Sequence, residues 1–307
     1  MSIDLSCYIS GFKLDTPFVL ASGIIGNEHS LILRALDEGA SAVVTKTVFK
    51  EPRNGYPPPV YFENEFYALN AVGLPNNGIA DFSNEIKKAK ESNKPVFVSV
   101  GGYDIEEYAY VAKQAVQAGA DGIELNLSCP HVKATGSEIG TDPNLIRQIV
   151  EAVKEAVGQK PVFAKLTPST DDIVRLGKAA LDAGTDGFTA VNTARGMAFD
   201  PVLEAPLLSN YYGGVSGRAL HPMAVYAVYA LRKKFPKTPI FGVGGVYTCR
   251  DALDFLLAGA DAIQVGSAVS SKGYRVFREL SEDLASFLLS KGYDSLRAFK
   301  EVKRRWF

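Results

Sequence analysis

The sequence predicts an α/β protein that folds as a single (β/α)8 barrel, a TIM barrel, and three observations support this prediction. Helical and strand-like stretches alternate along the whole chain. The strand-like runs are short and almost entirely apolar, as expected for parallel strands that helices cover. Eight such runs occur, which is the number that closes a parallel sheet into this barrel. An open doubly wound sheet is the alternative, but residues 23–28 (GIIGNE) lack the GxGxxG spacing typical of that fold.

Four of the eight strands follow a repeated pattern, in which a helix end is followed by small residues and then by an apolar run that ends in polar residues. The copies span residues 37–47, 117–128, 182–193 and 257–267. Glycine near each helix end allows the left-handed turn that begins the connection. The other four strands each begin at a proline, which is tolerated as the first residue of a strand. They span residues 17–22, 95–100, 161–166 and 239–244.

Helical periodicity fills the intervals between the strands. Asp104 and Glu107 have the spacing of a helix N-terminus, and apolar residues then recur on one face from Ile105 onward. Similar stretches lie near residues 28–38, 79–92, 143–157, 171–183, 222–235, 248–258 and 274–290. The N-terminal segment around Cys7 is predicted to form a small β element that closes the bottom of the barrel. Residues 1–307 are therefore expected to form one domain.

Composition excludes several classes of function. The chain has 33 basic and 34 acidic side chains, and it contains no long basic run. Neither nucleic acid nor a membrane surface is therefore an expected partner. No apolar run reaches the roughly 18 residues of a membrane-spanning helix, and the first residues do not resemble a signal peptide. We therefore expect a cytoplasmic protein.

The three cysteines, Cys7, Cys129 and Cys249, are odd in number and far apart, so they do not indicate a disulfide framework. No cluster of Cys and His has the spacing of metal ligands, and no metal is expected. Cys129 follows a strand end and is the candidate reactive thiol, since nearby cations could favour its thiolate. Cys7 and Cys249 are expected to be inert packing residues, and His29 and His221 are expected to be structural.

Three strand-to-helix connections are unusually long, at about residues 48–78, 129–142 and 194–221. All three follow the carboxyl ends of strands, which is the face where barrel enzymes build their sites. The first connection is rich in proline and aromatic residues. It could serve as a lid, as a partner surface or as packing over the barrel mouth.

Polar residues end the strands and are expected to meet at this face. Lys46 and Lys165 each follow an apolar run, so they are expected to meet a negatively charged ligand, unless they pair with buried carboxylates such as Glu124. Glycine-rich turns follow the last two strands at Gly244-Gly245 and at Gly266-Ser267. Backbone N–H groups at such turns can bind a phosphate, which belongs either to a cofactor or to a substrate.

Several motifs together resemble class 1 dihydroorotate dehydrogenases. They are Lys46-Thr47, residues 70–76 (NAVGLPN), residues 126–130 (NLSCP), Lys165, Asn192-Thr193, residues 214–217 (GVSG), Gly244-Gly245 and Gly266-Ser267. Their order and spacing match the family over nearly the whole chain. The resemblance implies an FMN-containing barrel that oxidises dihydroorotate to orotate in pyrimidine synthesis.

The resemblance also implies roles for individual residues. Cys129 would be the catalytic base that removes a proton from C5 of dihydroorotate while hydride passes from C6 to the flavin N5. Lys46 would serve substrate and flavin together, and Lys165 would stabilise negative charge on the reduced flavin. The implied substrate contacts are Lys46, Asn70, Ala71, Val72, Gly73, Leu74, Asn126, Asn192 and Thr193. The implied FMN contacts are Ser22, Lys46, Thr47, Ser99, Asn126, Lys165, Val191, Gly217, Gly244, Gly245, Gly266 and Ser267.

Two departures from the family pattern bear on function. His131 stands where the family usually has a substrate-contacting Asn, so it is either a substrate contact that depends on pH or a solvent-facing loop residue. Residues 192–197 and 257–260 are more similar to the NAD-linked type, although residues 73–76 are also similar to the fumarate-using type. NAD-linked relatives pass electrons to a separate subunit that carries FAD and a [2Fe–2S] cluster. The chain could therefore have such a separate partner subunit. The protein is expected to form a homodimer or a hetero-oligomer, and the sequence does not identify the electron acceptor.

Three other functions remain alternatives. A dihydropyrimidine dehydrogenase-like flavoenzyme would act on uracil or thymine, which lack a carboxylate. A barrel lyase or isomerase could bind a sugar phosphate at the same glycine turns, and it would purify colourless. A non-catalytic flavin-binding subunit would not depend on Cys129.

Overall fold

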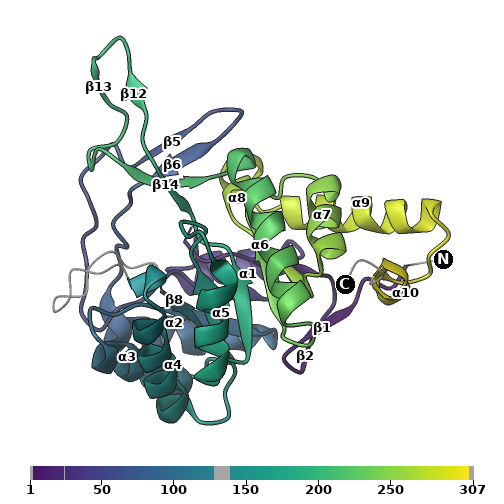
Figure 1. Ribbon diagram of the computed structural model, residues 1–307, viewed down its shortest axis with the longest axis horizontal. Coiled ribbons are helices and arrows are strands. Elements are labelled where there is room, and N and C mark those ends of the chain that lie inside the picture. Colours follow the sequence, from purple (N-terminus) through teal and green to yellow (C-terminus); the bar gives the residue numbers. More distant parts are fainter. Residues whose placement is uncertain (1–2, 24, 128–138, 304–307) are drawn as a thin grey trace.

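A closed barrel of eight parallel strands forms the centre of the protein in the computed structural model, which describes residues 3–23, 25–127 and 139–303 (Figure 1). The strands are β3 (Phe18–Leu20), β4 (Val43–Val44), β7 (Val96–Val100), β8 (Gly122–Asn126), β9 (Val162–Leu166), β10 (Gly187–Ala190), β15 (Ile240–Val243) and β16 (Ala262–Val265). They follow one another around the barrel in chain order, and β16 pairs with β3 to close it. The predicted TIM barrel is confirmed.

Eight helices connect or follow the barrel strands at the predicted places. They are α1 (His29–Asp37), α2 (Gly78–Ala89), α3 (Ile105–Gln117), α4 (Pro143–Val157), α5 (Ile173–Asp182), α6 (His221–Lys234), α7 (Cys249–Ala258) and α9 (Val276–Ser290). The Asp104 side chain accepts a hydrogen bond from the Glu107 N–H at 2.8 Å, as its spacing predicts. In the described part of the chain, two further α-helices lie outside the predicted set, α8 (Ser267–Lys272) and α10 (Leu296–Lys303).

The amino end of the barrel is filled by aromatic side chains. Phe163 packs on Phe241 with ring centroids 4.9 Å apart, and Phe97 contacts both rings. Phe12 packs edge-on against Phe97 at 5.4 Å and belongs to the hairpin of β1 (Cys7–Ile9) and β2 (Phe12–Leu14). The predicted N-terminal β element therefore covers the amino end of the barrel.

The first and third long connections join at the carboxyl end of the barrel. They form an antiparallel sheet in the order β11 (Ala194–Gly196), β14 (Gly213–Ser216), β6 (Ala68–Asn70) and β5 (Tyr61–Glu63). Two glycines in β14 permit the close packing of this sheet. A Cβ added at Gly213 would lie 2.3 Å from the Asn70 carbonyl oxygen, and one added at Gly214 would lie 2.2 Å from Thr193 Oγ1. The sequence predicted two long connections here but not that they pair.

Beyond this sheet, β12 (Phe199–Asp200) and β13 (Ala205–Pro206) form a hairpin that projects from the barrel (Figure 1). The hairpin exposes Phe199, Val202 and Leu203 to solvent. The second long connection lies mostly outside the described residues, and only the short 3-10 helix Ile139–Thr141 and the cap of α4 are described. In the described part of the chain, no helix has both the length and the apolar character needed to cross a membrane.

Candidate active site

A cavity of about 600 Å³ lies at the carboxyl end of the barrel, beside the added sheet. Most of the residues singled out from the sequence line it. They are Ser22, Lys46, Thr47, Asn70, Ala71, Val72, Gly73, Leu74, Asn126, Lys165, Val191, Asn192, Thr193, Gly244, Gly245, Gly266 and Ser267. These residues come together because the carboxyl ends of the parallel strands meet at one rim.

Two predicted residues lie behind the cavity lining instead. Ser99 is fully buried, and its hydroxyl lies 2.9 Å from the hydroxyl of Thr47, which does line the cavity. The carbonyl oxygen of Gly217 lies so close to Gly245 that a Cβ there would be only 2.5 Å from it. Both residues therefore support lining residues. Cys129 and His131 lie outside the described residues.

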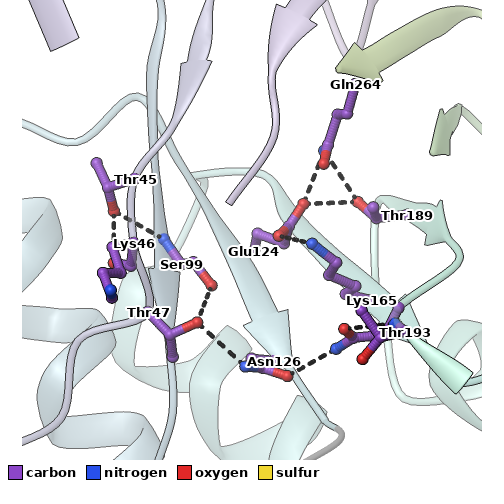
Figure 2. A network of polar contacts seen from close by, with 11 residues as sticks. Thr45, Lys46, Thr47, Ser99, Glu124, Asn126, Lys165, Thr189, Thr193 and Gln264 are labelled. Carbon is purple, nitrogen blue, oxygen red and sulfur yellow. Dashed lines mark hydrogen bonds and ion pairs between the residues drawn. The ribbon is translucent and has the colours of Figure 1, made fainter. Parts of the chain in front are cut away.

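A chain of hydrogen bonds links the strand ends across the cavity (Figure 2). The Asn126 amide donates to Thr47 Oγ1 at 3.1 Å, and the Asn192 amide donates to Asn126 Oδ1 at 3.0 Å. The Thr193 N–H in turn donates to Asn192 Oδ1 at 2.8 Å. The backbone of Asn126 is also held, since the Tyr108 hydroxyl donates to the Asn126 carbonyl oxygen at 2.7 Å. These bonds fix the amide orientations before a ligand arrives.

The two predicted lysines have different surroundings. Lys165 is almost fully buried, and its Nζ lies 3.2 Å from Glu124 Oε1, so the pairing with a buried carboxylate holds for this lysine. Lys46 has no ion-pair partner among the acidic side chains that the structure describes. Burial lowers the pKa of Lys46, because it disfavours the charged ammonium. Lys46 therefore provides a partly desolvated cation in the cavity.

The glycine turns leave backbone exposed to the cavity where side chains would not fit. Gly244 has φ +142° and an added Cβ would lie 2.7 Å from Ala224 Cβ, whereas Gly245 has φ +66°. Thr248 caps α7, and its reciprocal bonds with Asp251 complete a capping box directly after the turn. Backbone N–H groups of this kind suit an anionic group such as a phosphate.

Several lining residues were not predicted from the sequence to be site residues. They are Arg53, Tyr56, Tyr61, Tyr103, Ser216 and Ser270. Arg53 is the most polar of them, and its Nε and Nη1 atoms are buried without a hydrogen-bond partner in the described structure. Its guanidinium lies over the rings of Phe49 and Tyr103, at 4.8 Å and 5.1 Å from the ring centroids. The available indication of its role in the site was that Arg53 lies in the first long connection, at the carboxyl face of the barrel.

The remaining cysteines and histidines have structural surroundings. Burial raises the pKa of the Cys7 thiol to about 12, and burial with nearby Asp283 and Asp251 raises the pKa of Cys249 to about 11. Neither thiol is therefore poised to react. The His29 ring bonds to Glu85 at 2.7 Å, and His221 bonds to the Gly244 carbonyl oxygen and to Asp254. His221 thus supports the glycine turn.

Together, the closed barrel and its cavity define a ligand-binding α/β barrel whose carboxyl rim suits an anionic, hydrogen-bonding ligand and a phosphate. The chain belongs to the dihydroorotate dehydrogenase family, because the model of that family, described as "Dihydroorotate dehydrogenase", matches residues 4–288. This agrees with the resemblance found in the sequence.

Individual relatives align with this chain over almost their full length. A protein of Pyrococcus furiosus is 45% identical over 297 residues, which is 97% of each chain. A protein of Pyrococcus horikoshii is 44% identical over 293 residues, or 95% of each chain. A protein of Methanocaldococcus jannaschii is 42% identical and covers 92% of this chain and 93% of its own. All three are named "Dihydroorotate dehydrogenase B (NAD(+)), catalytic subunit", in line with the expected similarity to the NAD-linked type.

Proposed function

We propose that the protein is the catalytic subunit of a dihydroorotate dehydrogenase, an oxidoreductase that converts (S)-dihydroorotate to orotate in pyrimidine synthesis. The observation that carries this proposal is Lys46, a partly buried cation without a described carboxylate partner, in a cavity lined by Asn70, Asn126 and Asn192. An anionic substrate would supply the missing charge. The names of the relatives support the same reaction.

The amide-rich lining suits the substrate ring. Primary amides both donate and accept hydrogen bonds, which matches a ring that alternates N–H and carbonyl groups. Asn126 and Asn192 are already oriented by their neighbours, so little freedom is lost on binding. Asn70 is held by a bond from its amide to the Gly214 carbonyl oxygen at 3.1 Å. The substrate carboxylate would pair with the Lys46 ammonium.

The same cavity suits FMN, which would supply the hydride acceptor when bound. The turns at Gly244-Gly245 and Gly266-Ser267 would hold its phosphate, since their backbone lines the cavity and Gly244 and Gly245 leave no room for side chains. Lys165 would place a positive charge beside the flavin N1 and O2, where the reduced flavin carries negative charge. Ser22, Thr47 and Val191 would complete the contacts from neighbouring strand ends. Residues 1–307 would thus form one FMN-binding domain.

Cys129 would act as the base that takes the proton from C5 of dihydroorotate. It follows Asn126, the last residue of β8, by three positions in the sequence. A thiol needs a cationic environment to ionise near neutral pH, and Lys46 lines the same cavity as Asn126 at the carboxyl end of β8. The raised pKa values of Cys7 and Cys249 leave Cys129 as the thiol suited to this task.

Electrons would leave through a second polypeptide that carries FAD and a [2Fe–2S] cluster. A cluster of this type commonly takes four cysteine ligands, and the chain has three cysteines. The term "catalytic subunit" in the names of the relatives supports the same division of labour. The apolar tip of the β12–β13 hairpin suits protein contact, in a homodimer or a hetero-oligomer. We further propose that the assembly works in the cytoplasm.

A comparison of two substrates tests the proposed reaction. With FMN-loaded protein and an artificial dye as acceptor, kcat/KM for dihydroorotate should exceed that for dihydrouracil by roughly 10³-fold or more, because bound dihydrouracil would shield the Lys46 ammonium from water without giving it a charged partner. Initial rates measured side by side give this ratio. Preference for dihydrouracil would support the dihydropyrimidine dehydrogenase alternative, and protein that binds no flavin would support the sugar-phosphate alternative.

A further inference from the structure

A buried polar layer lies inside the barrel and contacts Lys165, which lines the cavity (Figure 2). It consists of Glu124 on β8, Thr189 on β10 and Gln264 on β16, each no more than 1% exposed. These strands alternate with others around the barrel, so the three side chains can meet only in its interior. The layer lies between the aromatic rings that fill the amino end and Lys165, which lines the cavity.

Among the residues that the structure describes, three hydrogen-bond donors contact the Glu124 carboxylate. Its Oε1 atom receives Lys165 Nζ at 3.2 Å. Its Oε2 atom receives the Thr189 hydroxyl at 2.9 Å and the Gln264 amide at 2.7 Å. An acceptor of three such bonds matches the ionised carboxylate. The layer therefore contains a fixed negative charge directly behind the Lys165 ammonium.

Stability alone does not explain this arrangement. A buried ion pair usually gives no more stability than well-packed apolar side chains of the same volume. The adjacent layer is in fact apolar, since Phe97, Phe163 and Phe241 fill it. The Gln264 Oε1 atom is buried without a hydrogen-bond partner in the described structure, which adds a further cost. These costs indicate a role toward the cavity.

We propose that Glu124 is a positioning residue that acts through Lys165 and thereby sets the redox potential of the bound flavin. The proposal rests on the proposed function, because it requires FMN in the cavity. Glu124 holds the Lys165 ammonium at the cavity edge and balances part of its charge, while Thr189 and Gln264 keep the carboxylate in place. An unbalanced Lys165 would stabilise the reduced flavin too strongly, which would hinder transfer of electrons onward.

The test is the variant Glu124→Gln, which keeps the shape of the side chain and removes its charge. The new amide can donate to Gln264 Oε1 after that side chain rotates, so the hydrogen bond between residues 124 and 264 is kept with its direction reversed, and the fold should be retained. The flavin midpoint potential, measured by anaerobic titration with reference dyes, should become more positive. We expect at least a tenfold change in the ratio of the affinities for reduced and oxidised FMN, which is about 30 mV for a two-electron couple.

Two comparisons separate action through Lys165 from a general charge effect. The control Asp182→Asn removes a carboxylate from an exposed pair with Lys178 and should leave the potential unchanged. In Lys165→Met protein kept loaded by excess FMN, the further change Glu124→Gln should have little effect. An equal shift with and without Lys165, or no shift in folded Glu124→Gln protein, overturns the proposal.

A swapped variant covers the case in which Glu124→Gln does not fold. Glu124→Gln combined with Gln264→Glu returns a carboxylate to the layer but away from Lys165, and its potential should lie above that of the unmodified protein. An unchanged potential in this variant also overturns the proposal. These outcomes are distinct from failure of the proposed function, in which the unmodified protein would not bind FMN or would not be reduced by dihydroorotate.

Discussion

Replacing Cys129 by alanine should slow anaerobic reduction of the bound FMN by dihydroorotate by about 10²- to 10⁴-fold, which is the usual contribution of a positioned base. The proton at C5 would lose its acceptor, whereas the phosphate turns and Lys165 would still hold the flavin. Stopped-flow absorbance of the flavin band measures the rate directly. The amount of bound FMN, measured after heat release, should be unchanged.

Cys249→Ala is the matched control, since that thiol is partly buried at the start of α7 and its raised pKa makes it unreactive. Its rate of reduction should equal that of the unmodified protein. If Cys129→Ala were reduced as fast as this control, another group would be the base. A loss of FMN from the Cys129 variant would instead assign this residue to cofactor binding.

Replacing Lys46 by methionine should raise KM for dihydroorotate by about 10- to 100-fold. A hydrogen bond to a charged group is worth about 1.5–3 kcal/mol, and methionine retains the apolar part of the side chain without the charge. Steady-state rates with a dye acceptor measure the effect. Lys178→Met is a suitable control, because Lys178 forms an exposed pair with Asp182 and lies outside the cavity lining.

The same lysine gives a pH dependence with a defined sign. Burial lowers the pKa of Lys46, so its ammonium is present below that pKa and is lost as the pH rises through it. Substrate affinity should therefore fall in alkaline solution at a pH below the ordinary lysine value. The Lys46→Met variant should lose this pH dependence. An unchanged KM in the variant would mean that Lys46 does not meet the substrate carboxylate.

The barrel could be predicted from the sequence because its determinants are local. Pro-initiated strands, glycine at helix ends and the Asp104 cap each act within a few residues. The sheet at the barrel mouth depends instead on pairing between β6 and β14, which are far apart in the chain. Its strands have three or four residues each, which is too short for a reliable alternation of polar and apolar residues.

The part of the candidate site that comes from strand ends was also predictable from the sequence. Asn126 is the last residue of β8, and the other three residues lie within two positions of a strand end: Lys46, Lys165 and Asn192. The fold itself brings strand ends together. Arg53 lies within a long connection, where position in the sequence says little about position in space. Gln264 is a single polar residue in an apolar strand, and nothing in its spacing indicates that it bonds to Glu124 across the barrel.

Addition of dihydroorotate to the purified, FMN-loaded protein in the absence of oxygen tests the central claim most directly. The account predicts that the yellow flavin band bleaches within one turnover and that an equal amount of orotate forms. A flavin-loaded sample that stays yellow with excess dihydroorotate, while a chemical reductant still bleaches it, would contradict the assignment of this substrate.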